Sequence, residues 1–205
     1  MAGLVKIGVF GGTFDPPHLG HLILAAEAQF QLRLDQVWFV LTPASPHKLG
    51  SVITPVDIRL DLLQAALIDN PEFSISRVEI DRPPPYFAAD TTRLLKNQNP
   101  QDEIVYLLGG DSLHDLPTWD RPQEFIAHCD LLGVMRRPGD AVDLEDLEAL
   151  LPGISARVCF IDAPLIEISS SKIRARVAAR RPYRYFLPPQ VVRLIEVKGL
   201  YRSSA

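Results

Sequence analysis

One segment near the N-terminus gathers residues that could act on a phosphate. It reads Gly-Gly-Thr-Phe-Asp-Pro-Pro-His-Leu-Gly-His and covers residues 11–21. Glycines after a strand let backbone N–H groups approach a phosphate, and a helix that starts beyond them points its partly positive N-terminus at the same place. His18 and His21 are three residues apart, so both imidazoles can lie on one side of the first helical turn. There they could donate hydrogen bonds to phosphate oxygens and stabilise charge that develops in a transition state.

The same segment does not fit the common phosphate-binding loops. The Rossmann dinucleotide fingerprint needs a third glycine at a spacing that is absent here, and a Walker A loop needs Lys-Ser/Thr after its glycines. The histidine pair could begin a zinc site, but no third ligand is evident nearby. A glycine turn with two incidental histidines is the plainer alternative, and the length of the string argues against it.

A second candidate phosphate site lies near the C-terminus. Ser169, Ser170 and Ser171 precede a predicted helix, where serines commonly cap the free N–H groups of the first turn. Those N–H groups, with Arg174 one turn further on, could also form a cradle for a triphosphate. Capping alone is the alternative interpretation.

Three single residues add to these two segments. Asp111 follows an apolar run and Gly109-Gly110, and it could cap the next helix or accept hydrogen bonds from ribose hydroxyls. Trp119 lies in a polar loop flanked by prolines, where its flat ring could stack on a pyridine ring. Lys48 lies in a loop over residues 43–54 and, by residue type alone, would be a surface lysine.

The elements that must position these residues alternate along the chain. Apolar runs predict strands at residues 5–10, 37–41, 73–80, 104–108, 131–135 and 157–161. Helical spacing, capping residues and prolines predict helices at about residues 19–32, 55–67, 88–98, 122–128, 144–150, 170–179 and 189–198. In the first of these the apolar stripe consists of Leu19, Leu22, Ile23, Ala26 and Phe30.

This alternation favours an α/β fold, a Rossmann-like parallel sheet with helices on both faces. Ligands of such sheets bind beyond the carboxyl ends of the strands. Both glycine turns, at residues 11–12 and 109–110, are therefore expected at the site, as is the serine turn.

The composition excludes several other classes of protein. Of 205 residues, 47% are apolar and 22% charged, as in ordinary globular proteins. Apolar runs are too short for a membrane span or a signal peptide, so the cytoplasm is the expected compartment. The two cysteines match no metal spacing or disulfide framework. The net charge is −4, and residues 171–205 carry nine Lys or Arg against one acid. That basic tail could bind nucleic acid or could simply be a solvated surface.

The N-terminal string resembles the nucleotidyltransferase superfamily that is marked by a His-x-Gly-His signature. Its full form is similar to that of the nicotinate-nucleotide adenylyltransferases, and residues 168–174, Ile-Ser-Ser-Ser-Lys-Ile-Arg, resemble the second marker of that family. The resemblance runs nearly end to end. It includes Pro46-His47-Lys48, Gly109-Gly110-Asp111-Ser112-Leu113, Leu116-Pro117-Thr118-Trp119, Arg136-Arg137-Pro138-Gly139 and Gly199-Leu200-Tyr201.

The resemblance implies a function and a division of the chain. It implies transfer of the adenylyl group of ATP to nicotinate mononucleotide with release of pyrophosphate, in NAD biosynthesis, with Mg²⁺ bound to ATP. It implies one nucleotidyltransferase domain over residues 1–205, in which a helical part at residues 165–205 completes the ATP site. The expected partners are these two nucleotides, with no membrane and no nucleic acid, and a homo-oligomer is left open.

The resemblance also assigns roles to residues. The expected catalytic residues are His18, His21, Lys48 and Arg174. The expected ATP-binding residues are Gly11, Gly12, Thr13, Phe14, His21, Gly109, Asp111, Ser169, Ser170, Ser171 and Arg174. The expected mononucleotide-binding residues are Thr13, Lys48, Ala88, Trp119 and Asp120. No residue is expected to bind a metal directly.

Two departures from the family pattern leave the mononucleotide open. Residues 86–91 read Tyr-Phe-Ala-Ala-Asp-Thr where the family often has Ser-Tyr-Thr-x-Asp-Thr, so Ala88 replaces a threonine near the acid group of the pyridine. Asp120 follows Trp119 where some members have tyrosine. One alternative is therefore an enzyme that prefers nicotinamide mononucleotide. Another is an inactive nucleotide-binding or RNA-binding regulator.

Overall fold

A six-stranded parallel sheet forms the centre of the molecule. The computed structural model of the chain describes residues 3–44, 53–136, 144–164 and 166–202. The strand order is β3-β2-β1-β4-β5-β6, and every neighbouring pair is parallel. The strands are β1 (Lys6–Gly12), β2 (Gln36–Leu41), β3 (Phe73–Ser76), β4 (Glu103–Gly109), β5 (Leu131–Arg136) and β6 (Val158–Asp162). The predicted α/β, Rossmann-like sheet is confirmed.

The strand order reverses at the centre of the sheet, between β1 and β4. Loops that leave two such strands diverge to opposite faces, and the gap beyond their carboxyl ends is the usual ligand site of this architecture. Here β1 ends at Gly12 and β4 ends at Gly109, so both predicted glycine turns lie at that gap.

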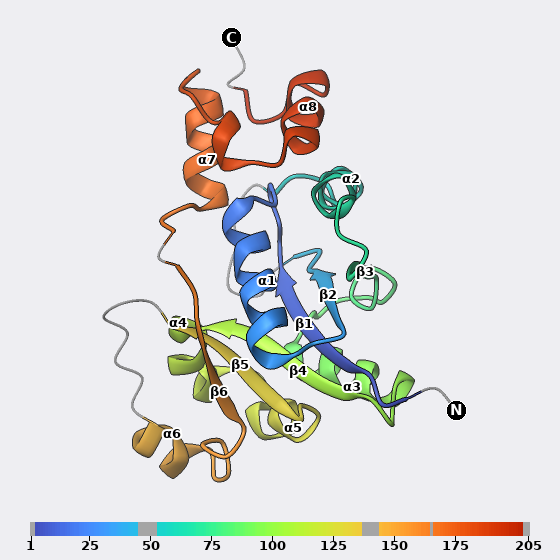
Figure 1. Cartoon of the computed structure of the whole chain (residues 1–205), viewed down its shortest axis with the longest axis vertical. Helices are drawn as coiled ribbons and strands as arrows, with labels where there is room; N and C mark the ends of the chain where they lie inside the picture. Colours follow the sequence, from blue (N-terminus) through green and yellow to red (C-terminus); the bar gives the residue numbers. More distant parts are fainter. Residues whose placement is uncertain (1–2, 45–52, 137–143, 165, 203–205) are drawn as a thin grey trace.

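Helices cover both faces of the sheet (Figure 1). On one face, α1 (Leu19–Leu32) and α2 (Val56–Leu67) pack on the strands in one apolar core. On the other face, α3 (Ala88–Gln98), α5 (Pro122–Ala127) and α6 (Leu144–Leu150) form a second core. None of the helices in the described ranges is long and apolar enough to span a membrane.

The C-terminal helices pack on α2 instead of on the sheet. They are α7 (Ser170–Ala178) and α8 (Pro189–Val197), joined through a short 3-10 helix, η3 (Arg184–Phe186). Leu62 and Ala66 of α2 enclose a third apolar core with Ile173, Val191 and Ile195. Figure 1 shows α7 and α8 together at one end of the molecule, beyond α2.

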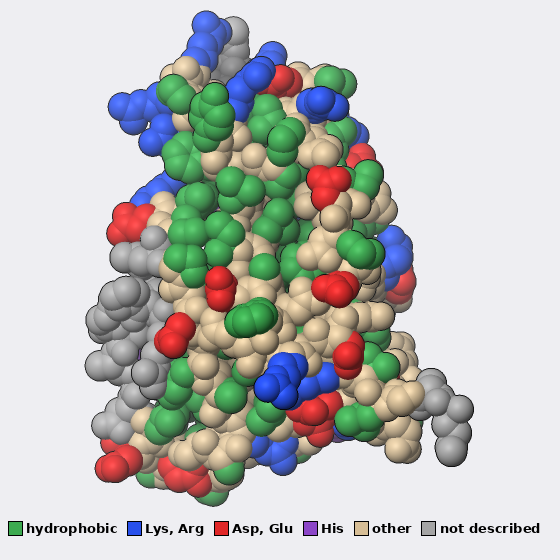
Figure 2. Space-filling model, in the orientation of Figure 1, with side chains coloured by type: hydrophobic (Ala, Val, Ile, Leu, Met, Phe, Trp, Pro, Cys, Tyr) green, Lys and Arg blue, Asp and Glu red, His purple; other side chains and the backbone are tan. Residues whose placement is uncertain are grey.

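Much of the basic charge of the C-terminal part is used within the fold. Figure 2 shows Lys and Arg side chains gathered at the end formed by α7 and α8. Arg184 pairs with Glu196 at 2.7 Å, and Lys198 pairs with Asp61 at 2.8 Å. The Arg176 guanidinium lies over the Phe186 ring, 4.8 Å from its centroid.

Two details differ from the sequence-based expectation. The strand predicted over residues 73–80 ends at Ser76, because the backbone turns at Arg77 and the Asp81 N–H bonds to the Arg77 carbonyl at 2.9 Å. The predicted helix α1 is confirmed, but its apolar spacing marks the core face only in part: Leu22 packs on the core and Phe30 is 81% exposed. The buried apolar residues of this helix are Ala25, Ala28 and Leu32.

Candidate functional site

Two cavities open beyond the carboxyl ends of β1 and β4. The first has a volume of about 630 Å³ and the second about 470 Å³. Gly12, Thr13 and Ser112 line both. Thr13 directly follows β1, and Ser112 belongs to α4 (Gly110–His114), which directly follows β4. The cavities therefore share a wall at the centre of the sheet, where a group bound in one can meet a group bound in the other.

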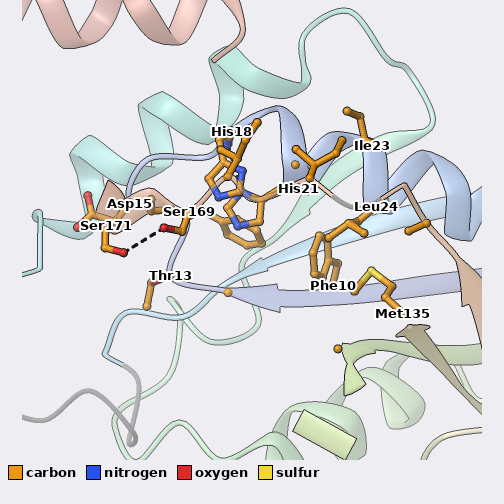
Figure 3. Close-up of a pocket in the computed structure, with 18 of the residues that line it drawn as sticks. Phe10, Thr13, Asp15, His18, His21, Ile23, Leu24, Met135, Ser169 and Ser171 are labelled. Carbon is orange, nitrogen blue, oxygen red and sulfur yellow. Dashed lines mark hydrogen bonds between the residues drawn. The ribbon is translucent and has the colours of Figure 1, made fainter. Parts of the chain in front are cut away.

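His18 and His21 stack against each other at the start of α1. Their ring centroids are 3.6 Å apart and their planes differ by 21°. His18 is the N-cap residue, and its backbone N–H donates to His21 Nδ1 at 3.1 Å. A neutral His21 must therefore carry its proton on Nε2. Both histidines line the first cavity, and Figure 3 shows the two rings side by side.

Burial keeps the His18 imidazole neutral. Its side chain is 5% exposed, and loss of hydration lowers its pKa to about 4. Its Nδ1 is buried and has no hydrogen-bond partner within the described part of the chain. Gly20 makes room for this ring, because a Cβ at residue 20 would lie 3.0 Å from His18 Nδ1. At neutral pH the His18 imidazole is therefore uncharged.

The Phe14 ring supports the glycine turn from the core. It is 2% exposed and meets His21 edge-on, with centroids 5.1 Å apart. A Cβ at Gly12 would lie 2.9 Å from Phe14 Cζ, so only glycine lets the backbone pass over the ring. Phe14 lines the first cavity, as expected of an ATP-binding residue, but its side chain fills the space beneath the turn.

The C-terminal serine turn lies against the N-terminal glycine loop. Ser169 caps α7 by accepting from the Lys172 N–H at 3.3 Å, and its hydroxyl lies 3.2 Å from that of Ser171. The Ser170 hydroxyl donates to the Pro16 carbonyl at 2.8 Å. The serine turn therefore caps α7 and lines the cavity at the same time. All three serines and Arg174 line the first cavity with the two histidines, although the segments lie some 150 residues apart.

The first cavity has a polar and an apolar end. Figure 3 shows Thr13, Asp15, Ser169 and Ser171 on one side of the histidines. The apolar side chains on the other side, which also line the cavity, are Phe10, Ile23, Leu24 and Met135. Sequence reasoning missed this apolar end. Ile23 belongs to the predicted stripe of α1, but the spacing alone cannot separate a core face from a ligand face.

The second cavity is lined by Trp119, Ala88 and Asp120, three of the expected mononucleotide-binding residues. The Trp119 ring is braced by Phe125, at a centroid distance of 5.3 Å. Phe125 in turn meets the Tyr106 ring edge-on at 4.9 Å. Such a chain of rings holds an indole in one orientation, as stacking on a planar ligand requires.

Arg121 holds the Asp120 carboxylate. Its Nε donates to Asp120 Oδ1 at 2.6 Å, and its other nitrogens reach Asp90 at 2.8 Å and Glu124 at 3.0 Å. The hydrogen bond from Arg121 lowers the pKa of Asp90. Asp120 therefore lines the second cavity as a paired charge, which weakens the repulsion that it would exert on an anion there.

Glu79 is a buried acid on the second cavity that sequence reasoning missed. Its side chain is 4% exposed, and burial raises its pKa. Thr91 Oγ1 lies 2.6 Å from its Oε1, whereas its Oε2 has no hydrogen-bond partner among the described residues. The only sequence signal was an acid at the end of a predicted strand, which usually faces solvent.

Arg59 of α2 ties together the loops that carry the site, and it too was missed. It is 1% exposed and donates to four carbonyl oxygens at 2.7–2.8 Å, those of Thr13, Thr42, Pro43 and Thr54. Burial lowers its pKa, and the charge of nearby Asp15 opposes this effect. Arg59 shares the buried face of α2 with Leu62, Leu63 and Ala66, so a charge within an apolar stripe was the available signal.

The remaining expected residues fall in three places. Gly109 and Asp111 line the first cavity, and Asp111 lies exposed in the first turn of α4. Gly11 lines the second cavity instead of the first, and a Cβ there would lie 2.8 Å from the Tyr106 hydroxyl. Lys48 lies outside the described residues, so its role stays a prediction.

The chain is similar to known proteins in both sequence and structure. Residues 9–176 match the cytidylyltransferase-like family. A probable nicotinate-nucleotide adenylyltransferase of Thermomicrobium roseum is 47% identical over 97% of this chain and 92% of its own. The nicotinate-nucleotide adenylyltransferase of Bacillus subtilis is 38% identical over 97% of this chain and 99% of its own.

Solved structures share the fold at lower identity. Nicotinic acid mononucleotide adenylyltransferase of Plasmodium falciparum, complexed with NaAD, superimposes with a TM-score of 0.75 at 19% identity, covering 96% of this chain and 97% of its own. The complex of the same enzyme with APC also gives a TM-score of 0.75, at 18% identity over the same shares.

Proposed function

The chain belongs to the cytidylyltransferase-like family and, within it, to the nicotinate-nucleotide adenylyltransferases, and on that premise we propose that it transfers the adenylyl group of ATP to nicotinate mononucleotide. The products are nicotinate adenine dinucleotide and pyrophosphate, in NAD biosynthesis. Charged nucleotides do not cross a membrane unaided, so we also propose that the reaction takes place in the cytoplasm.

The junction of two cavities at Thr13 carries this proposal. A transfer between two nucleotides needs two sites that meet where the phosphates react, and a binding protein for one nucleotide needs only one. The first cavity suits ATP, because its apolar end can enclose a purine and its polar end has two helix N-termini, those of α1 and α7. The second cavity suits the mononucleotide, because Trp119 offers a face to the pyridine ring.

The chemistry follows from this placement. An oxygen of the mononucleotide 5′-phosphate attacks the α-phosphorus of ATP, the new P–O bond forms, and the bond to the β-phosphate breaks with pyrophosphate leaving. The attacking oxygen is already ionised at neutral pH, so no general base is needed. Catalysis then consists of aligning two anions and relieving their repulsion. His21 Nε2–H, the neutral His18 and the Arg174 guanidinium supply donors on the ATP side, and Thr13 supplies one at the junction.

Mg²⁺ is proposed to enter with ATP. Within the described ranges, no group of three His, Cys, Asp or Glu side chains is close enough together to hold a metal ion. The triphosphate itself would provide the ligands, and the ion would neutralise part of its charge. The protein residues then act on the phosphate oxygens that the ion leaves exposed.

We propose the acid over the amide as the preferred mononucleotide. Arg121 neutralises Asp120 at the cavity, and the backbone N–H groups of Ala88 and Asp120 remain donors whatever the side chains are. A pyrophosphate-release assay with ATP, Mg²⁺ and either mononucleotide at subsaturating concentration tests this. We expect a larger kcat/KM for nicotinate mononucleotide. Equal or reversed values would overturn the preference, and no release with either would overturn the activity.

A further inference from the structure

Tyr201, close to the C-terminus, reaches the loop that carries the histidines. Its hydroxyl donates to Asp15 Oδ1 at 2.7 Å, across 186 residues of sequence. Burial and the Asp15 charge raise the pKa of this hydroxyl, so it stays a donor throughout the working pH range. Tyr201 adopts a left-handed backbone with φ 60°, in the turn four residues after the end of α8. This conformation is costly for a residue with a side chain, so contacts of the side chain must compensate for it.

Asp15 is buried at the edge of the first cavity. It is 3% exposed, and each carboxylate oxygen has its own donor: Tyr201 bonds to Oδ1, and the Thr54 N–H bonds to Oδ2 at 3.2 Å. A buried carboxylate is costly unless both oxygens are satisfied. Removing the Tyr201 hydroxyl would therefore leave Oδ1 in need of a new partner.

Arg174, one of the cations proposed to bind the triphosphate, forms an ion pair with this carboxylate. Arg174 Nη1 donates to the Asp15 backbone carbonyl at 2.6 Å but lies 3.9 Å from the carboxylate Oδ2. Among the described residues, Arg174 makes no other hydrogen bond, and its side chain is 36% exposed along the first cavity. The guanidinium is thus hydrogen-bonded to the backbone and only loosely ion-paired with the carboxylate, and its remaining N–H groups are left to a ligand.

We propose that Tyr201 is a positioning residue for ATP, which satisfies the Asp15 carboxylate and so keeps the Arg174 guanidinium turned toward the triphosphate. This inference rests on the assignment of the first cavity to ATP. It makes the end of the chain part of the nucleotide site without any contact between Tyr201 and substrate. Figure 3 shows Asp15 at the polar end of the cavity, beside Ser169 and Ser171.

The test is a double-mutant cycle read by calorimetric binding of a non-hydrolysable ATP analogue. In Tyr201→Phe, the unsatisfied carboxylate should draw Arg174 onto itself, and the Kd for the analogue should rise about tenfold, as for loss of one charge-assisted hydrogen bond. In Tyr201→Phe combined with Asp15→Asn, the neutral amide no longer competes for Arg174. The Kd should then return to within about twofold of the Asp15→Asn value.

Two controls separate positioning from stability. Tyr183→Phe removes a hydroxyl from the same C-terminal part, where it donates to Glu196 at 3.4 Å and lines neither cavity, and it should leave the Kd unchanged. In assays, Tyr201→Phe should raise the KM for ATP and not that for the mononucleotide, with the melting temperature lowered by only a few degrees.

Three results would overturn the proposal. The first is an unchanged Kd in Tyr201→Phe, and the second is an equal rise of both KM values in that variant. The third is a double variant, Tyr201→Phe with Asp15→Asn, that still binds the analogue more weakly than Asp15→Asn alone. The calorimetry needs only the ATP analogue, so it tests the role of Tyr201 even if the wild-type protein does not use nicotinate mononucleotide. A failure to use that mononucleotide would overturn the proposed function and not the role of Tyr201.

Discussion

The backbone N–H of His18 donates to Nδ1 of His21, and the two imidazoles stack 3.6 Å apart at the start of α1. The hydrogen bond fixes the tautomer and orientation of the His21 ring, and the His18 ring packs against that ring. Both rings line the cavity that we propose for the triphosphate.

Replacement of His21 by alanine should lower kcat about a hundredfold, the usual effect of removing one transition-state donor. The KM values should change little, because this donor acts on charge that develops during transfer. Steady-state pyrophosphate release measures both constants. His114→Ala is the control, since His114 is exposed and lines neither cavity. Unchanged turnover in His21→Ala would remove His21 from the mechanism.

His18 should titrate with a pKa of about 4 in the folded protein, against 6.5 when exposed. The unfolded chain then binds more protons between these two values. The free energy of unfolding should therefore fall as the pH drops from about 6.5 to 4, and this group should have no effect above that range. Titration of the His18 ring by NMR measures the pKa directly. A value of 6.5 or higher would show that burial does not govern this imidazole.

Trp119→Ala should raise the KM for nicotinate mononucleotide about tenfold or more, because stacking of a base on an aromatic ring is worth roughly 1–3 kcal/mol. The KM for ATP should stay the same, and Trp119→Phe should be milder. Trp38→Phe provides the matched control, because Trp38 lies on β2 and lines neither cavity. A parallel rise for ATP would mean that Trp119 supports the whole site instead of one ligand.

Arg59→Lys should destabilise the fold by about 3 kcal/mol or more, although it keeps the charge. A lysine ammonium cannot reproduce the planar fork that bonds to four carbonyls, and hydrogen bonds from charged groups contribute about 1.5–3 kcal/mol each. Urea unfolding would measure the loss, with Arg193→Lys on the exposed side of α8 as control. A change below about 1 kcal/mol would contradict the structural role of Arg59.

Local patterns predicted most of the fold. The helix over residues 88–98 was predicted with the bounds that it has, after prolines that end the preceding segment. The central strands were predicted because apolar runs end in glycines. The short α4 and η2 (Leu116–Thr118) escaped prediction, since their few residues show no period. The end of β3 is set by the turn that follows at Arg77, and the apolar residues of the segment do not predict that turn.

The site was predictable where the residues stand in one short string, and not where they meet through the fold. The histidines, the serine turn and Trp119 belong to such strings. Asp15 and Tyr201 are joined only because α8 packs on α2, and no spacing in the sequence relates them. The same holds for the apolar end of the first cavity, which draws side chains from several elements.

Co-crystallisation with nicotinate mononucleotide and a non-hydrolysable ATP analogue tests the central claim most directly, that two cavities meet at Thr13 for transfer. We predict the pyridine ring on Trp119 and the triphosphate between His21 and the serine turn. The attacking oxygen should lie about 3–3.5 Å from the α-phosphorus beside Thr13. Both ligands in one cavity, or two phosphates that lie apart at opposite ends of the sheet, would contradict the account.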